Sequence, residues 1–433
     1  MAAALPARAP SATSILILIL LCVGLSAPSA LAGQPPAAGG ALAAFDPYAA
    51  TEAYLNTLTP AQKAKSDAYF EGGYWLLLLG LLFSVGVACL FLFTGLSGRL
   101  ARGAGRFGNV NVRNLVYCGG YLLLAYLFTF PLNLYQNFYR EHQYGLSNLS
   151  FGAWLRDELV GLGLQLVFGG LLLTALYGAI RRTGRNWWVW GTGLCLLFLV
   201  LALFIGPVFI SPLFNEYQPL PDGKVKDAIL SMARANGVPA DNVYAFDASR
   251  QTKRISANVS GLGSTIRISL NDNLLNRGTP AEVKAVMGHE LGHYVLNHTY
   301  KLLLSLGLVV LAGFAFIDAV FRRLVAARGQ QWQISGIADA KGLPVLMGLF
   351  SLYVFLSTPV INGIVRTSEM EADVFGLNAA REPDGFASIA MKLSEYRKIA
   401  PGYWEEMLFF DHPSGRTRVL TAMKWKAENL PGR

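Results

Sequence analysis

Six apolar stretches, each close to 20 residues, constrain this chain more than any other feature of its sequence. A helix of about 20 apolar residues is long enough to cross the hydrocarbon core of a membrane. The stretches are Tyr74–Thr94, Leu115–Tyr135, Leu159–Ile180, Trp187–Ile210, Leu302–Phe321 and Leu343–Ile361. The composition agrees, because 53% of the 433 residues are hydrophobic and only 15% are charged. The sequence therefore predicts a mostly α, multi-span membrane protein.

The N-terminal segment 1–32 resembles a secretory signal peptide. It carries Arg8, then an apolar run from Ile15 to Leu25, and small residues before Gly33, the order typical of a cleavable signal. An uncleaved first span is the alternative, so we expect six to seven transmembrane helices. The signal-like start indicates a protein of the bacterial inner membrane.

The net charge of +9 does not indicate nucleic-acid binding, because many arginines sit in short clusters between apolar stretches. Such clusters mark cytoplasmic loops under the positive-inside rule. They are Arg99, Arg102, Arg106 and Arg113; Arg181, Arg182 and Arg185; and Arg322, Arg323 and Arg328. If all three lie in the cytoplasm, the polar regions 211–301 and 363–433 lie on the opposite, periplasmic side.

These two polar regions are large enough to carry chemistry, but each is small for an independent core. We therefore expect one split α+β catalytic domain at the membrane boundary. The first region predicts a helix over Lys224–Asn236 and strands at Val243–Asp247, Arg254–Ser260 and Thr265–Leu270. The expected organisation is a flexible or extramembrane lead-in (33–71), four spans (72–210), a catalytic segment (211–301), two spans (302–362) and a second catalytic segment (363–433).

The run His289-Glu290-Leu291-Gly292-His293 carries the strongest chemical signal. It lies in a predicted helix from Thr279 to His298, with Thr279 as N-cap and Glu282 completing a capping box. Histidines four residues apart on a helix project from the same side and can share one metal ion. Glu290 is then placed to take a proton from a metal-bound water. This spacing is typical of zincin peptidases and predicts one Zn²⁺ per chain.

A catalytic zinc needs a third protein ligand and an open position. His298 is a weak candidate, because on a continuous helix it points about 140° away from His293 at 100° per residue. Glu369 and Asp373, just after the last span, share a helical face, while Glu371 points elsewhere. One of these two acids can bind the metal, and the other can orient a ligating histidine.

Together, these features resemble the type I CAAX prenyl proteases, integral-membrane zinc endopeptidases with HtpX-like proteases as relatives. The resemblance extends over roughly residues 70 to 425. It is carried by the histidine motif, by Glu369-Met370-Glu371-Ala372-Asp373, by Asp411-His412-Pro413-Ser414 with Arg418, and by segments that flank the middle spans, such as Pro212-Leu213-Phe214-Asn215 and Pro219-Leu220-Pro221-Asp222-Gly223.

The resemblance implies a role for each matching residue. His289, His293 and Glu369 would bind zinc, and Glu290 would be the general base. Asp373 would orient a ligand, and His412 and Arg418 would lie near the scissile carbonyl and help to bind substrate or oxyanion. One position departs from the family, which often has an Asn-Ala pair on the strand that docks substrate, whereas this chain has Ser256-Ala257 with Asn258 displaced.

The sequence thus predicts a zinc metalloendopeptidase that hydrolyses peptide bonds with a metal-activated water. Its expected partners are a peptide or membrane-protein substrate and the lipid bilayer, with no nucleic acid. CAAX-protease-like cleavage is the first interpretation, and HtpX-like quality control of membrane proteins is the alternative. A catalytically inactive membrane scaffold is the non-enzyme alternative. The resemblance implies a cytosol-facing site, in conflict with the periplasmic placement that the arginine clusters indicate.

Overall fold

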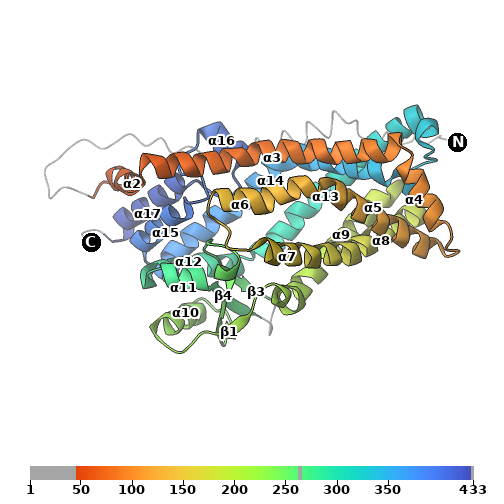
Figure 1. Cartoon of the computed structure of the whole chain (residues 1–433). Helices are drawn as coiled ribbons and strands as arrows, with labels where there is room; N and C mark the ends of the chain where they lie inside the picture. The colour runs from red at the N-terminus through yellow and green to blue at the C-terminus, as the bar shows by residue number, and fades with distance from the viewer. Residues whose placement is uncertain (1–44, 262–265, 431–433) are drawn as a thin grey trace, which may run out of the picture.

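The computed structural model describes residues 45–261 and 266–430, so the signal-like segment 1–32 lies outside the described residues. Figure 1 shows an elongated molecule in which long helices run side by side and a small sheet lies toward one end. The sheet shares that end with the C-terminal helices α15 (Pro383–Leu393) and α17 (Gly415–Asn429). At the other end, the described residues form only helices and their connections.

Five helical stretches of the described chain are long and apolar enough to cross a membrane. One of them, 151–213, contains two of the six predicted spans, because the chain turns at Gly184, where φ is 54°. The helices of this part are α3 (Pro60–Phe93), α4 (Leu96–Ala104), α5 (Val110–Leu134), η1 (Tyr135–Tyr139), α6 (Arg140–Gln143), α7 (Phe151–Leu164), η2 (Gln165–Gly169), α8 (Gly170–Thr183), η3 (Gly184–Asn186), α9 (Trp187–Ile205), η4 (Gly206–Ile210), η5 (Ser211–Leu213), α13 (His298–Trp332), η8 (Ala340–Gly342) and α14 (Leu343–Ala380).

Several of these helices are much longer than a span. The 38 residues of α14 measure about 57 Å at 1.5 Å per residue, whereas the hydrocarbon core is about 30 Å thick. Glu369 lies about 39 Å along this helix from Leu343. A single unbroken helix therefore crosses the membrane and carries the candidate third ligand beyond it.

Of the two expectations for the lead-in over 33–71, flexible or extramembrane, the flexible one does not hold for the described residues 45–71, which are largely helical. Asp46 caps α2 (Pro47–Leu55), and its carboxylate accepts a hydrogen bond from the Tyr48 backbone N–H at 2.9 Å. Thr59 and Gln62 form a capping box at the start of α3. Leu55 is buried in a cluster with residues of α15 and α17. These caps and this contact with the C-terminal helices make the segment ordered.

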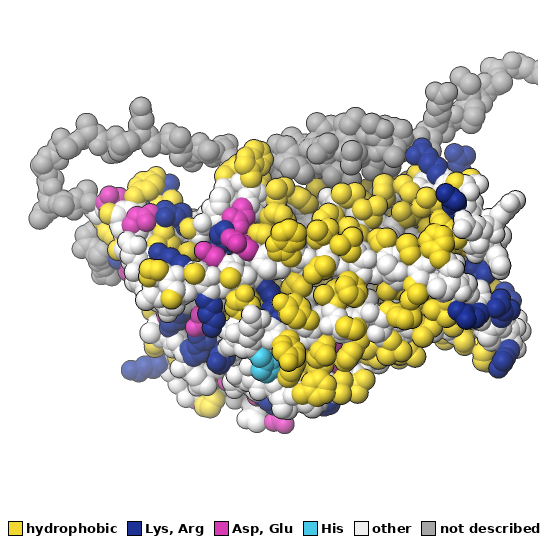
Figure 2. Space-filling model, turned by 45° about the horizontal axis from the view of Figure 1, so that its top comes forward, with side chains coloured by type: hydrophobic (Ala, Val, Ile, Leu, Met, Phe, Trp, Pro, Cys, Tyr) yellow, Lys and Arg dark blue, Asp and Glu magenta, His cyan; other side chains and the backbone are white. Residues whose placement is uncertain are grey.

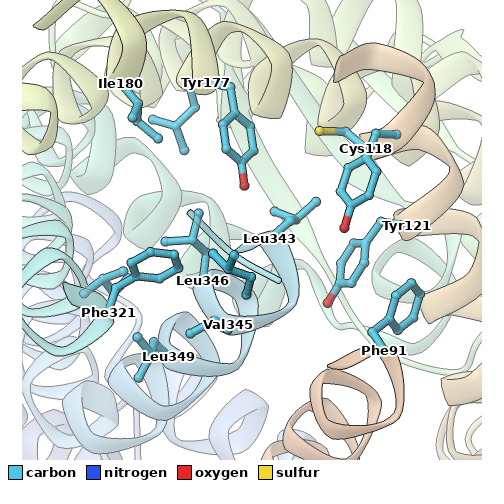
Figure 3. Close-up of a cluster of buried hydrophobic side chains, with 14 of the residues drawn as sticks. Phe91, Cys118, Tyr121, Tyr177, Ile180, Phe321, Leu343, Val345, Leu346 and Leu349 are labelled. Atoms are coloured by element: carbon cyan, nitrogen blue, oxygen red, sulfur yellow. The ribbon is translucent and has the colours of Figure 1, made fainter. Parts of the chain in front are cut away.

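The end of the bundle away from the sheet has its own hydrophobic core. Figure 3 shows side chains from five helices pointing toward one another: Phe91 from α3, Cys118 and Tyr121 from α5, Tyr177 and Ile180 from α8, Phe321 from α13, and Leu343, Val345, Leu346 and Leu349 from α14. The outer surface of these helices and of α9 is also apolar, with Trp75, Leu82, Leu197 and Leu304 exposed. Figure 2 shows this apolar surface as a broad band. A soluble protein rarely exposes so large an apolar surface to water, so this band is the surface that contacts the lipid, and the protein is an integral membrane protein.

The small sheet has the order β1-β2-β4-β3 and consists of β1 (Tyr217–Pro219), β2 (Val243–Phe246), β3 (Ala257–Ser260) and β4 (Arg267–Asn271). Three of these strands match the predicted ones, and β1 was not predicted because it has only three residues. Strand β3 pairs with β4 alone and forms an edge of the sheet. Beside the sheet lie α10 (Lys224–Ala235), α11 (Asp272–Arg277) and α12 (Pro280–Val295). In the sequence, a short helix α16 (Tyr403–Phe409) connects α15 with α17.

The two polar regions share one hydrophobic core. Ile229 of α10, Leu270 of β4 and Leu291 of α12 pack in the same cluster as Ala380 of α14 and Ile389 of α15. Residues that precede the last two spans in the sequence therefore pack against residues that follow them. The arrangement has the form expected of a split catalytic domain.

Candidate metal centre

Helix α12 begins as its sequence predicts and ends earlier. The Thr279 hydroxyl accepts from the Glu282 N–H, and the Glu282 carboxylate accepts from the Thr279 N–H at 2.7 Å. Glu282 is 2% exposed, and its carboxylate also binds Lys392 and Ser388 of α15. The helix ends at Val295, because Asn297 adopts a left-handed conformation with φ 58°. The expectation of a continuous helix to His298 is wrong.

Glycines allow α12 and α14 to cross closely. A Cβ atom on Gly376 would lie 2.7 Å from the backbone nitrogen of His289, and one on Gly288 would lie 2.9 Å from the Gly376 carbonyl oxygen. Neither position has room for a side chain. On the next turn, a Cβ on Gly292 would meet the Ala372 Cα at 3.2 Å. This contact brings the histidines of α12 up to the acids of α14.

Three side chains from these two helices converge on one point. His289 Nε2 lies 3.1 Å from His293 Nε2 and 3.3 Å from Glu369 Oε2, and His293 Nε2 lies 3.4 Å from Glu369 Oε1. In a tetrahedral zinc site with bonds of about 2.0–2.1 Å, ligand atoms lie about 3.3–3.4 Å apart. The donor types and their spacing therefore fit a metal ion held by His289, His293 and Glu369.

Asp373 and Arg418 fix the orientation of His289. Asp373 Oδ1 lies 2.8 Å from His289 Nδ1, and Arg418 Nε donates to Asp373 Oδ2 at 2.9 Å. All three side chains are buried. Because the carboxylate accepts the Nδ1 proton, the lone pair of His289 Nε2 stays free to bind a metal. Burial lowers the pKa of His289, but its bonds with Asp373 and Glu369 outweigh burial and raise it to about 9. The surrounding charges thus favour a cation.

His298 fixes the orientation of His293, which the sequence analysis did not foresee. Its Nδ1 lies 2.9 Å from His293 Nδ1, and its Nε2 lies 3.0 Å from Glu371 Oε2. Glu371 also accepts from Lys301 at 2.6 Å. When His298 Nε2–H donates a hydrogen bond to Glu371, His298 Nδ1 is unprotonated and accepts a hydrogen bond from His293 Nδ1–H. His293 Nε2 is then free to bind a metal. The angular argument against His298 assumed a continuous helix, and Asn297 breaks that helix.

Glu290 lines a pocket of about 240 Å³ next to this centre. His289, Glu369, His412 and Arg418 line the same pocket. Burial, the largest influence, raises the pKa of Glu290 to about 7. A carboxylate with a pKa near neutral can accept a proton and later return it.

His412 also lines this pocket. Its Nε2 lies 3.3 Å from Glu369 Oε2, and its Nδ1 donates to Asp411 Oδ1 at 2.8 Å. His412 and Arg418 both reach the pocket, as the resemblance implied, although two of the Arg418 nitrogens are engaged by Asp373. No sequence spacing connects His412 with the histidine motif.

The edge strand β3 passes along the site. Ser256 and Ala257 line the pocket that contains Glu290, and Asn258 lines a neighbouring cavity of about 670 Å³ that reaches His293. The outer edge of β3 pairs with no strand among residues 45–261 and 266–430. An extended peptide could add to this edge through backbone hydrogen bonds, which do not require the family's Asn-Ala pair.

Family models match most of the chain. Residues 219–426 match the model of peptidase family M48. Residues 49–216 match the model described as CAAX prenyl protease N-terminal, five membrane helices. The first match contains the metal centre, and the second contains the first group of spans.

Individual relatives cover a similar extent. The chain is 31% identical over 311 residues to the uncharacterized metalloprotease YhfN of Bacillus subtilis, covering 71% of this chain and 72% of that protein. It is 28% identical over 338 residues to CAAX prenyl protease 1 of Saccharomyces cerevisiae, covering 73% of each. The crystal structure of S. mikatae Ste24p has the same fold, with a TM-score of 0.71 at 20% identity over 94% of this chain and 96% of that one.

Proposed function

This chain belongs to peptidase family M48, and on that premise we propose that it is a zinc-dependent endopeptidase that hydrolyses peptide bonds at the membrane boundary. Its family and its spans make it an integral-membrane metallopeptidase. The observation that carries the zinc assignment is the set of three nitrogen and oxygen donors from His289, His293 and Glu369, spaced 3.1 to 3.4 Å apart.

The residues around these donors divide the work of hydrolysis. A bound zinc ion supplies a Lewis acid that lowers the pKa of water and polarises a carbonyl. Glu290 acts as the general base, holds the proton that water gives up, and delivers it to the leaving amine. His412 and the free part of the Arg418 guanidinium face the substrate and stabilise the negative charge that develops on the scissile carbonyl oxygen. Asp373 keeps the ligand His289 in the required tautomer.

We propose that the substrate binds as an extended strand on β3. Its backbone would pair with the free edge of β3, and its scissile bond would lie over Glu290. The cavity of about 670 Å³ has an apolar wall that includes Ala202, Leu203 and Pro207, at the end of a span. This wall supports a substrate that carries a lipid or a membrane-embedded segment.

The leading candidate substrate is a C-terminal peptide of the CAAX type, as the name of the yeast relative indicates for that protein. The second candidate is a damaged membrane protein, as expected for an HtpX-like quality-control protease. The apolar cavity wall favours both over a fully soluble peptide. A scaffold without activity is opposed by the complete donor set.

The substitution Glu290→Gln tests the mechanism and identifies the substrate. The amide keeps the shape of the carboxylate but cannot accept the proton. We expect near wild-type zinc content and the loss of at least about 100-fold of peptidase activity, since general-base catalysis contributes about 10²–10⁴-fold. Peptides that co-purify with this variant would be identified by mass spectrometry.

The variant Glu369→Gln provides the matched comparison. It removes a proposed metal ligand, so both zinc content and activity should fall. Normal turnover by Glu290→Gln would contradict the role of Glu290 as general base. A wild-type protein that contains no zinc and cleaves nothing would favour the scaffold alternative.

A further inference from the structure

Arg397 lies in the loop that follows α15 and lines the pocket of Glu290. Its neighbours on the pocket wall include His412 and Arg418, and the apolar side chains of Ile389 and Leu393 close the pocket nearby. The side chain is partly buried. No motif in the sequence marks this arginine, and the mechanism proposed above does not use it.

Among the residues that the structure describes, the guanidinium of Arg397 has no hydrogen-bonding or ion-pair partner, and its carbon lies 6.0 Å from the centre of the Tyr396 ring. It makes no hydrogen bond within 3.5 Å and no ion pair within 4.0 Å there. The two acids whose charges act on it are engaged elsewhere: Asp411 with His412, and Glu369 with His289 and His293. Arg418 on the same wall forms an ion pair with Asp373, whereas Arg397 forms none with the described residues.

A guanidinium in a pocket loses hydration, and this loss is costly unless a negative group replaces the water. Burial and the neighbouring charge of Arg418 both lower the pKa of Arg397, although an arginine stays protonated. Its planar fork of N–H donors matches a carboxylate in a bidentate geometry. The pocket thus presents an unused cation to whatever occupies it.

We propose that Arg397 binds the C-terminal carboxylate of the substrate, so that the enzyme cleaves a short distance from a free C-terminus. This proposal rests on the proposed peptidase function. The pocket volume of about 240 Å³ is below the range of about 300–1,000 Å³ of ordinary small-molecule sites. A pocket of this size accommodates a short peptide segment.

The proposal also sets the direction of the substrate. If the C-terminal end occupies the pocket with Arg397, the N-terminal side extends along β3 into the cavity of about 670 Å³ beside the end of α9. The part of the substrate that remains attached to the membrane then faces the apolar wall, and the released fragment is the short polar end.

Two peptide mixtures that differ only at the C-terminus test the proposal. Both contain internally quenched peptides with randomised positions near the end, one with a free acid and the other with an amide. The zinc-loaded wild-type enzyme should cleave the acid form about 10- to 100-fold faster in kcat/KM, as expected for a charge-assisted bidentate pair. Mass spectrometry should place the cut at a constant short distance from the C-terminus.

The variants Arg397→Gln and Arg397→Lys show whether this residue causes the preference. Arg397→Gln should lose the preference by slowing the acid form while leaving the amide form nearly unchanged, and Arg397→Lys should restore part of it. Arg416→Gln is the control, because Arg416 pairs with Glu52 on the surface. An equal loss for both peptides would indicate a structural role and overturn the proposal.

Binding separates this proposal from the proposed function. Labelled acid and amide peptides are titrated against Glu290→Gln, with and without Arg397→Gln, and followed by fluorescence anisotropy. Tighter binding of the acid peptide that disappears with Arg397→Gln supports carboxylate recognition even if nothing is cleaved. Equal cleavage and equal binding of both peptides by the protein with Arg397 would overturn the carboxylate site and leave the peptidase function standing. Peptides with an internal Asp in place of the free C-terminus distinguish a side-chain carboxylate, and a preference for them would overturn the terminal assignment.

Discussion

At the scale of single residues, the metal ligands are oriented by two different hydrogen-bonded chains. His289 is held by Asp373 and Arg418, and His293 is held by His298 and Glu371. Each chain contains a carboxylate that favours the proton on Nδ1 of the histidine, so Nε2 of each histidine is the atom left to bind a metal. Residues that orient ligands in this way typically change metal affinity by about 10–100-fold when they are replaced.

We therefore expect His298→Ala to lower zinc affinity by about 10- to 100-fold, because His293 loses the partner that fixes its tautomer. Zinc affinity would be measured by competition with a chelator in detergent. His142→Ala is the control, since the ring nitrogens of His142 lie 2.7 and 2.9 Å from the backbone oxygens of Phe138 and Leu149, outside the metal centre. Unchanged zinc affinity in His298→Ala would contradict the orienting role.

At the scale of elements, the site depends on the close crossing of α12 and α14. The capping box sets where α12 begins, and its glycines set how near α14 can approach. Because α14 is one unbroken helix from the span to Ala380, the position of Glu369 is tied to the packing of the membrane bundle. The metal centre is therefore sensitive to the spacing of these two helices.

The substitution Gly376→Ala tests this spacing. The added methyl group would lie 2.7 Å from the His289 nitrogen, so the helices must separate. We expect a loss of about 1–3 kcal/mol in stability together with a lower zinc content. Gly348→Ala, on the same helix, places its methyl group at an ordinary 3.4 Å from Ala88 and should change neither quantity in thermal unfolding and zinc analysis. Equal behaviour of the two variants would refute the argument.

At the scale of the whole molecule, the three arginine clusters gather at the end far from the metal centre, where Figure 2 shows a group of basic side chains. Arg181 donates to Asn111 at 2.9 Å, and Ser97 donates to the Lys341 carbonyl. These contacts join the loops that carry the clusters. The positive-inside rule then favours a cytoplasmic location for this end and a periplasmic location for the catalytic end.

A reporter fused after Arg433 tests this orientation, because α17 lies at the catalytic end. Alkaline phosphatase, which is active outside the cytoplasm, should be active there, and a fluorescent protein that matures only in the cytoplasm should stay dark. The same reporters inserted after Arg185, at the far end, should give the opposite result. Cytoplasmic activity after Arg433 would overturn the periplasmic placement and agree with the cytosol-facing site that the family resemblance implies.

The sequence alone identified the spans, the family, the cap of α12 and the residues that the structure brings together at the metal centre. The spans, the cap and the helical pairs depend on hydrophobic periodicity and on the spacing of residues along continuous helices, whereas the resemblance of the motifs pointed to the family and to Glu369 as the third ligand. About one helical turn separates His289 from His293, and the same spacing separates Glu369 from Asp373. Such local relations survive folding because the helix geometry itself enforces them.

Tertiary structure decided what local spacing could not. A single left-handed residue, Asn297, turned His298 back onto His293, and a loop after α15 brought Arg397 into the pocket of Glu290. Both contacts join groups whose relative direction is set by a helix break or by packing between distant segments. The sequence thus determined which metal ligands are available, whereas the packing of α12 against α14 decided which side chains orient them and which charge is left free.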